Sequence, residues 1–338
     1  MIRIPFPKRK TLPLLATGNN KKEICFMGSF LWNVDDILTV DSNIKLPFSK
    51  EELIVCVFSY NRPQYFKRVL DQIKANDRGY NYIFIQDFPC TEADVNDCVI
   101  CANYINDIDL KNKVMLSPTK NLCIGITTTE AYRIIFENSD IDFCLFMQDD
   151  ILISSKYVET INILRKQFVD VESIFSVKAY NSIEFSTEEE TNNNINKYCL
   201  SRGVVHQYGV GIWKSRWMRM KKTYDMYYDY MKNIKYRERE RDNDIIRNIF
   251  KKMALKYGKN LDFSSEGTAE DSAICVCLKL EEMNELSTAV SRGTCIGEDG
   301  LHFRSDLYSS LIWKKWEDGV YLEKISRFEV PDKFFPLS

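Results

Sequence analysis

Short apolar runs alternate with amphipathic stretches from residue 53 onward. The continuous run Leu53–Phe58 predicts a strand buried on both faces, as in a parallel sheet. Residues 65–75 then repeat apolar side chains at helical spacing, and Tyr82–Ile85 forms a second buried run. A strand, a helix and a strand in this order predict a parallel pair of strands joined by a right-handed crossover.

The alternation continues along the chain. Residues 91–108 predict a helix, Lys113–Leu116 a short strand, Thr127–Glu137 a helix and Phe143–Met147 another buried strand. This order predicts the α/β class, with a Rossmann-type, mostly parallel central sheet flanked by helices. Ligands of such sheets bind beyond the carboxyl ends of the strands. The polar residues at those ends are Ser59, Asn61, Arg62, Gln86, Asp87, Gln148, Asp149 and Asp150.

Pattern and composition divide the chain into four parts. Residues 1–50 mix proline, lysine and short apolar pieces, which predicts an N-terminal extension packed on the core. Residues 51–155 contain the regular alternation, residues 156–313 are less regular, and residues 314–338 predict a tail that packs back onto the domain. Within the third part, the polar residues 188–194 predict a surface loop.

Composition narrows the class of protein. The 338 residues carry a net charge of −2, from 46 basic and 48 acidic side chains, and 45% of them are hydrophobic. This argues against disorder and against a nucleic-acid partner, since nucleic-acid-binding domains are usually strongly basic. No apolar run reaches the roughly 18 residues that a membrane span needs. Prolines and charges among the first ten residues argue against a secretory leader, so we expect a cytoplasmic chain.

The cysteines and histidines favour buried thiols over structural zinc. Among 11 cysteines, Cys98 and Cys101 form one CxxC pair, but the chain has only two histidines, His206 and His302. A zinc site would need a second close pair at suitable spacing and histidine partners. We therefore expect reduced thiols that act as small hydrophobic side chains.

The segment Gln148–Asp150 directly follows the predicted strand Phe143–Met147. Hard divalent cations take oxygen ligands, and Mg²⁺ or Mn²⁺ is often held by one or two carboxylates together with substrate phosphates. Such a cation would stabilise the charge that develops on a diphosphate leaving group. The alternative is a solvated acidic turn.

Four segments, in this order, resemble the GT-A-fold nucleotide-sugar glycosyltransferases, in a family 2-like form. They are Ser59–Pro63 after the first strand, Gln86-Asp87 after the second, Asn121–Ile126 before a helix, and Gln148–Asp150, which is similar to the DxD metal motif. The resemblance covers roughly residues 52–310. It implies a GT-A-like fold with a helical insertion, in which residues 51–155 bind the donor and residues 156–313 bind the acceptor.

The resemblance also implies roles for individual residues. Asp150 would bind the Mn²⁺ or Mg²⁺ that bridges the diphosphate, whereas Gln148 stands where the family usually has an acid. A glutamine can still hydrogen-bond a ribose hydroxyl. Nucleotide-sugar contacts would come from Ser59, Tyr60, Asn61, Arg62, Gln86, Asp87, Asn121, Gly125, Gln148 and Asp149.

A second acidic pair, Glu270-Asp271, precedes a helix-like apolar run. The pair resembles the acids at the acceptor site of the family, where an inverting transfer needs a carboxylate to take the proton of the acceptor hydroxyl. We expect Asp271 to be this base and Glu270 to contact a sugar. The alternative is that both acids only favour the dipole of a helix in its first turn.

Further candidates lie in the second half of the chain. The segment Gly297–His302 predicts a tight loop, and a late histidine of the family implies that His302 is a second metal ligand, the alternative being a structural residue. For His206 the structural interpretation is favoured. Gly211 and Trp213 resemble a glycine-aromatic loop that contacts the acceptor, the alternative being a core tryptophan beside a turn.

Residues 214–259 hold 15 lysines and arginines against six acids, with tyrosines between them. A solvated helical face is the first interpretation of such a charge run. The second is a surface that meets anionic lipid, which would place the protein peripherally at the inner membrane face. Nucleic-acid binding is the least favoured.

The sequence as a whole predicts an enzyme that transfers a sugar from a nucleoside-diphosphate sugar, with a UDP-sugar favoured by family frequency. The acceptor would be a carbohydrate or a lipid-linked glycan, the reaction metal-dependent, and inversion is expected. A sugar nucleotidyltransferase is an alternative, but such enzymes offer a glycine-rich phosphate loop and Ser59–Pro63 has no glycine. The other alternative function is a catalytically inactive module that binds a nucleotide or a glycan.

Overall fold

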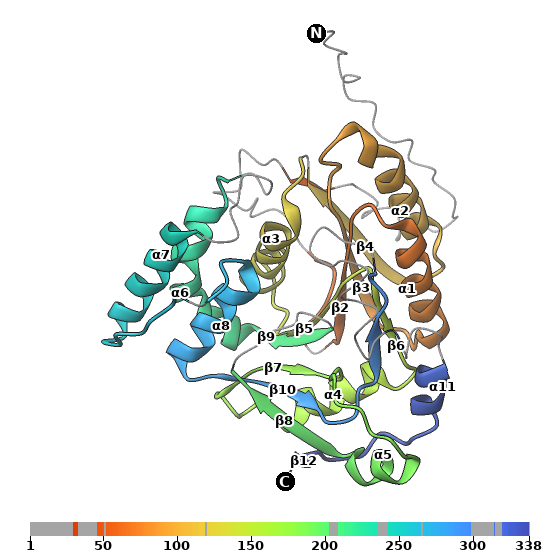
Figure 1. The fold of residues 1–338 in the computed structure, drawn as a ribbon. Helices are drawn as coiled ribbons and strands as arrows, with labels where there is room; N and C mark the ends of the chain where they lie inside the picture. The colour runs from red at the N-terminus through yellow and green to blue at the C-terminus, as the bar shows by residue number, and fades with distance from the viewer. Residues whose placement is uncertain are drawn as a thin grey trace.

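The structure is a computed structural model (Figure 1). It describes residues 30–32, 46–50, 52–118, 120–202, 209–234, 243–264, 266–298, 314 and 320–337. Most of the predicted extension 1–50 therefore lies outside the described residues, as do His206 and His302. Within the parts of the chain that are described, no helix is both long and apolar enough to cross a membrane.

The described residues build a ten-stranded central sheet in the order β1-β4-β3-β2-β5-β9-β7-β10-β8-β12. Its strands are β1 (Phe30–Trp32), β2 (Ile54–Ser59), β3 (Asn81–Gln86), β4 (Asn112–Pro118), β5 (Phe143–Met147), β7 (Ile174–Lys178), β8 (Lys197–Ser201), β9 (Val210–Trp213), β10 (Asn284–Thr288) and β12 (Phe335–Pro336). Strands β1 to β5 pair in parallel, whereas β9 is antiparallel to both of its neighbours. The predicted mostly parallel α/β sheet is confirmed.

Two helical layers cover the sheet (Figure 1). One layer contains α1 (Pro63–Asn76), α2 (Val95–Asp107), α4 (Tyr157–Gln167) and α11 (Val320–Ser326), and the other contains α3 (Cys123–Glu137), α6 (Lys214–Met231), α7 (Asp244–Lys256) and α8 (Glu270–Glu281). Alternate side chains of β2 point to opposite faces, so that Val55 and Val57 join the first layer and Ile54, Cys56 and Phe58 join the second. This explains the continuous apolar run in the sequence.

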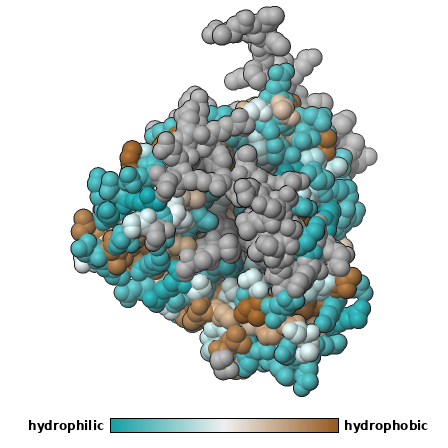
Figure 2. Space-filling model, in the orientation of Figure 1, coloured by the Kyte–Doolittle hydropathy of each residue, from teal (hydrophilic) through white to brown (hydrophobic). Residues whose placement is uncertain are grey.

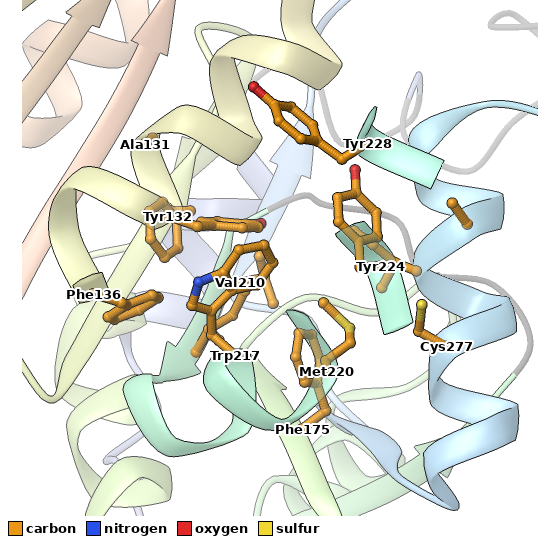
Figure 3. Close-up of a cluster of buried hydrophobic side chains, with 14 of the residues drawn as sticks. Ala131, Tyr132, Phe136, Phe175, Val210, Trp217, Met220, Tyr224, Tyr228 and Cys277 are labelled. Carbon is orange, nitrogen blue, oxygen red and sulfur yellow. The ribbon is translucent and has the colours of Figure 1, made fainter. Parts of the chain in front are cut away.

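Aromatic side chains fill the second layer (Figure 3). The ring centroid of Tyr132 on α3 lies 5.0 Å from that of Trp217 on α6 and 4.6 Å from that of Phe146 on β5. Trp217 is completely buried. Its contacts fix the helices of the basic segment on the sheet, so this segment carries its charges on a helical insertion whose inner face is core.

The prediction of a surface loop over residues 188–194 was wrong, because these residues form the short helix α5 (Glu188–Asn194). The Thr187 hydroxyl accepts a hydrogen bond from the Glu190 N–H at 3.1 Å, and the Glu190 carboxylate accepts one from the Thr187 N–H at 3.2 Å. This reciprocal capping box starts a helix that has almost no apolar face.

A small second sheet brings distant residues to the end of β5. Strand β6 (Ile151–Ile153) pairs in antiparallel fashion with β11 (Gly293–Cys295). The Ile296 N–H also donates to the carbonyl oxygen of Asp150 at 2.8 Å. Residues 296–298 therefore lie beside the acidic pair that follows β5.

Candidate active site

The carboxyl ends of β2 and β3 are tied together by side chains. The Ser59 hydroxyl donates to Oε1 of Gln86 at 2.7 Å, and Nε2 of Gln86 donates to the Tyr60 carbonyl at 2.8 Å. Both Ser59 and Gln86 are buried. The structure thus brings together the polar strand ends that the sequence singled out.

Tyr60 and Asn61 are also engaged within the protein. Nδ2 of Asn61 donates to Oδ1 of Asp94 at 2.7 Å, in the short 3-10 turn Glu92–Asp94. The Tyr60 hydroxyl accepts the Cys90 N–H at 2.9 Å. These contacts hold the loop after β2 against the loop after β3.

The Asp87 carboxylate holds the loop that leads into α3. Its oxygens accept the N–H groups of Phe88, Leu122 and Cys123 at 2.8–3.1 Å, and Nδ2 of Asn121 at 3.2 Å. Burial raises the pKa of this carboxyl to about 6, although the backbone hydrogen bonds lower it. Asp87 and Asn121 organise the loop in this structure, and their contact with a nucleotide stays a prediction.

The Glu270 side chain, which comes from α8, lies against the first turn of α3. Cys123, the first residue of α3, has a φ of 66°, a left-handed conformation that is costly for a residue other than glycine. Two residues later, a Cβ on Gly125 would lie 2.7 Å from Cδ of Glu270. Only a glycine therefore allows the Glu270 carboxylate, from the first turn of α8, to rest against α3.

Asp271 lies next to Glu270 but is exposed, and its Oδ1 accepts the Ser272 N–H at 2.7 Å. The two acids of the predicted catalytic pair therefore differ in environment. Glu270 contacts a second motif, whereas Asp271 is exposed to solvent in the first turn of its own helix.

A single guanidinium joins the two acids that follow β5. Arg62 contacts Oδ1 of Asp149 with Nη2, and its Nη1 lies 2.9 Å from Oδ2 of Asp150. Both aspartates are buried. Burial by itself lowers the pKa of Arg62, but the two carboxylates outweigh it and keep the pKa above its ordinary value. Burial raises the pKa of Asp150, which Arg62 opposes.

One carboxylate oxygen of the acidic pair is suited to coordinate a cation. Oδ1 of Asp150 is buried and has no hydrogen-bond partner among the described residues, although Arg62 contacts Oδ2 of the same carboxylate. The backbone of Gly297 lies against Asp150 so closely that a Cβ there would collide with Oδ2. An orphaned carboxylate oxygen in a walled site suits Mn²⁺ or Mg²⁺.

Asp150 would hold such a cation, with Asp149 next to it. Among the described residues, no three histidine, cysteine, aspartate or glutamate side chains are grouped so that they could hold a metal ion together. The protein ligands offered there are therefore carboxylates of one pair, and the predicted ligand His302 lies outside the described residues. Gln148 precedes the pair and is half-buried.

Gly211 and Trp213, the predicted acceptor contacts, lie away from Asp149 and Asp150. Trp213 pairs with Phe143, the first residue of β5, and is therefore at the opposite end of this strand from Asp149 and Asp150. It is buried, with its ring centroid 5.1 Å from that of Phe143. Gly211 makes room for the Phe143 ring. These positions support the alternative of a core tryptophan rather than an acceptor contact.

One residue of the site was missing from the expected set. Gly297 lies against both Asp150 and Arg62, yet His302 was the one candidate that the sequence offered in this loop. The available signal was the pair of glycines that brackets the acids of this loop. Its position beside Asp150 depends on the pairing of β6 with β11, which no local pattern reveals.

No family model matches this chain, and no curated protein matches it. Solved structures with partial similarity include a galactosyltransferase, LgtC, in complex with donor and acceptor sugar analogs (14% identity, TM-score 0.30, 54% of this chain). They also include a mannosyltransferase from Pyrobaculum calidifontis in complex with GDP-Man and Mn²⁺ (12%, 0.32, 66%). A third is glucosyl-3-phosphoglycerate synthase from Mycobacterium tuberculosis with Mn²⁺, UDP and glucosyl-3-phosphoglycerate (10%, 0.27, 48%).

This chain spans 66%, 58% and 57% of the length of those three structures, respectively. The descriptions of the first two name glycosyl transfer, by a galactosyltransferase and a mannosyltransferase, and the third names a synthase with UDP and Mn²⁺ bound. These similarities are partial and the aligned sequences are divergent.

Proposed function

We propose that this chain is a GT-A-type glycosyltransferase that takes its sugar from a nucleoside-diphosphate sugar. The observation that carries the proposal is the cluster at the carboxyl end of β5. There the buried Asp149 and Asp150 face the guanidinium of Arg62, and one carboxylate oxygen has no partner within the described part of the chain. A diphosphate needs cationic partners, and Arg62 and a divalent cation on Asp150 would supply them.

The residues around this cluster would share the work of binding. Ser59 and Gln86, which hydrogen-bond each other, would lie under the nucleotide, and the Asp87 carboxylate positions the start of α3. A cation on Asp150, when bound, neutralises charge on the departing diphosphate. Arg62 can donate to phosphate oxygens with its planar fork of N–H groups.

The acidic pair of α8 would act on the acceptor. Asp271 is the proposed base because its carboxylate is open to solvent, from where an acceptor hydroxyl can approach. Glu270 rests against Gly125 at the start of α3 and is the proposed sugar contact. A base on the acceptor side predicts inversion, and proton NMR showing that the donor's anomeric configuration is kept in the product would contradict it.

The nature of the acceptor is a separate part of the proposal. Helix α7 and the residues after it expose Ile245 (54%), Leu255 (65%) and Leu261 (38%). The exposed lysines of the same helix are Lys251, Lys252 and Lys256. Figure 2 shows apolar surface at the left edge of the view, where Figure 1 places α7. This mixture supports contact with anionic lipid and hence a lipid-linked glycan as acceptor.

The experiment is a product analysis with nucleotide sugars, Mn²⁺ and two sets of acceptors, soluble sugars and lipid-linked glycans. A glycosyltransferase releases a nucleoside diphosphate and a glycosylated acceptor. A sugar nucleotidyltransferase, tested with a sugar phosphate and a nucleoside triphosphate, would instead release inorganic diphosphate. Donor binding without either product would identify an inactive binding module and contradict the proposal.

A further inference from the structure

Arg62 forms ion pairs with the same carboxylates that would bind a cation. Its Nη1 lies 2.9 Å from Oδ2 of Asp150, and its Nη2 and Nε both face the Asp149 carboxylate. The residue stands in the loop between β2 and α1, whereas the acids follow β5. One flexible side chain therefore bridges two neighbouring strand ends.

The charges in this cluster do not balance. In the part of the chain that the structure describes, two carboxylates face one guanidinium, and Oδ1 of Asp150 has no partner. Gly297 closes one side, since even a Cβ there would meet Asp150, and it would lie 3.2 Å from Nη1 of Arg62. A cation bound through Asp150 would therefore lie close to the guanidinium, and like charges repel strongly in a partly buried site.

Access to the acids also involves Arg62. Its side chain is 25% exposed, whereas those of Asp149 and Asp150 are 6% and 9% exposed. The arginine is thus the solvent-facing member of the cluster and the acids lie beneath it. A long side chain at the surface can exchange partners more readily than buried carboxylates can.

We propose that Arg62 is a built-in competitor of the divalent cation. Without a donor, it neutralises Asp149 and Asp150 and keeps the affinity of this site for the cation low. A bound diphosphate gives the guanidinium another anion and frees the carboxylates for the metal. The inference rests on the proposed function in taking a nucleoside diphosphate as the ligand that releases Arg62.

The test is the affinity of the full chain for Mn²⁺ alone, measured from the electron paramagnetic resonance signal of free Mn²⁺. Arg62→Gln removes the competing charge and should bind Mn²⁺ about tenfold more tightly than the unmodified chain. Arg62→Lys keeps the charge and should stay close to the unmodified affinity. Arg78→Gln is the matched control, since Arg78 is exposed in the loop before β3, at the opposite end of the sheet.

Arg62→Gln leaves two neighbouring buried acids without their counter-charge and could fold poorly. Its melting temperature with and without Mn²⁺ provides a second readout, because a ligand that binds the folded state stabilises it. The rise on adding Mn²⁺ should be larger for Arg62→Gln than for the unmodified chain.

Equal or weaker Mn²⁺ affinity in Arg62→Gln would overturn the inference. If the unmodified chain still transfers sugar in that case, only this inference fails and the proposed function stands. An absence of Mn²⁺ binding in all four chains would overturn the inference and the metal part of the proposed function together.

Discussion

Asp87 illustrates how burial and hydrogen bonding oppose each other at a single residue. Its carboxylate accepts four N–H groups, which favour the charged form, yet its pKa is raised to about 6 by burial. The sequence placed this acid correctly at the end of β3. It could not reveal that the partners would be backbone groups of the loop before α3, because that contact depends on tertiary packing.

The raised pKa of Asp87 predicts a pH-dependent difference in stability. Between its ordinary pKa of 3.8 and about 6, the folded chain binds a proton that the unfolded chain does not, so this contribution to the unfolding free energy grows as the pH falls through that range. Relative to Asp87→Asn, the unmodified chain should gain about 2 kcal/mol between pH 7 and pH 4.5. Urea unfolding at the two pH values measures this, and a difference that is independent of pH would contradict it.

Trp213 shows a choice that residue-level reasoning left open. A tryptophan next to glycines is compatible with sugar stacking or with a core, and both interpretations were open from the sequence. The direction of β9 decides between them. Because β9 runs antiparallel to β5, its last residue lies at the amino end of β5, away from Asp149 and Asp150.

At the scale of elements, the starts of α3 and α8 meet at Gly125 and Glu270. An alanine at residue 125 would place its Cβ 2.7 Å from Cδ of Glu270, which is the end of a flexible side chain that can move away. Helix propensity favours alanine over glycine by about 1 kcal/mol. Gly125→Ala should therefore change the unfolding free energy by less than about 1 kcal/mol.

The same substitution should nevertheless reduce sugar transfer, by about tenfold, because Glu270 is displaced from the proposed sugar site. Steady-state kinetics of Gly125→Ala beside Glu270→Gln measures this loss. If both variants keep full activity, the contact between the two helix starts has no part in catalysis.

Helix α7 carries the membrane part of the proposal, and its exposed leucine provides the test. Leu255→Ser removes a side chain that is 65% exposed, so the fold should be unaffected. Co-sedimentation with vesicles of phosphatidylglycerol and phosphatidylcholine should weaken by about tenfold, as expected for one leucine lost from an apolar contact.

Leu200→Ser is the matched control for this surface, since Leu200 is 52% exposed on β8. It should leave vesicle binding unchanged. Equal binding of both variants, or no binding of the unmodified chain, would leave the lysines of α7 as a solvated face.

At the scale of the whole molecule, the sheet explains why local sequence patterns predicted some residues of the site and missed others. Parallel strands bring their carboxyl ends to one edge, so Ser59, Gln86 and Asp149 were predictable from three short apolar runs. Contacts between distant segments were not. Gly297 reaches Asp150 through the pairing of β11 with β6, and Glu270 reaches Gly125 because α3 and α8 both pack against α6.

The central claim is that the carboxyl edge of this sheet binds a nucleoside diphosphate together with a divalent cation. The most direct measurement is the melting temperature with UDP, GDP and their sugars, with and without Mn²⁺, for the unmodified chain and for Asp150→Asn. We predict that one nucleotide raises the melting temperature only when Mn²⁺ is present, and that Asp150→Asn loses this rise. An unchanged Mn²⁺-dependent rise in Asp150→Asn, or no rise with any nucleotide, would contradict the account.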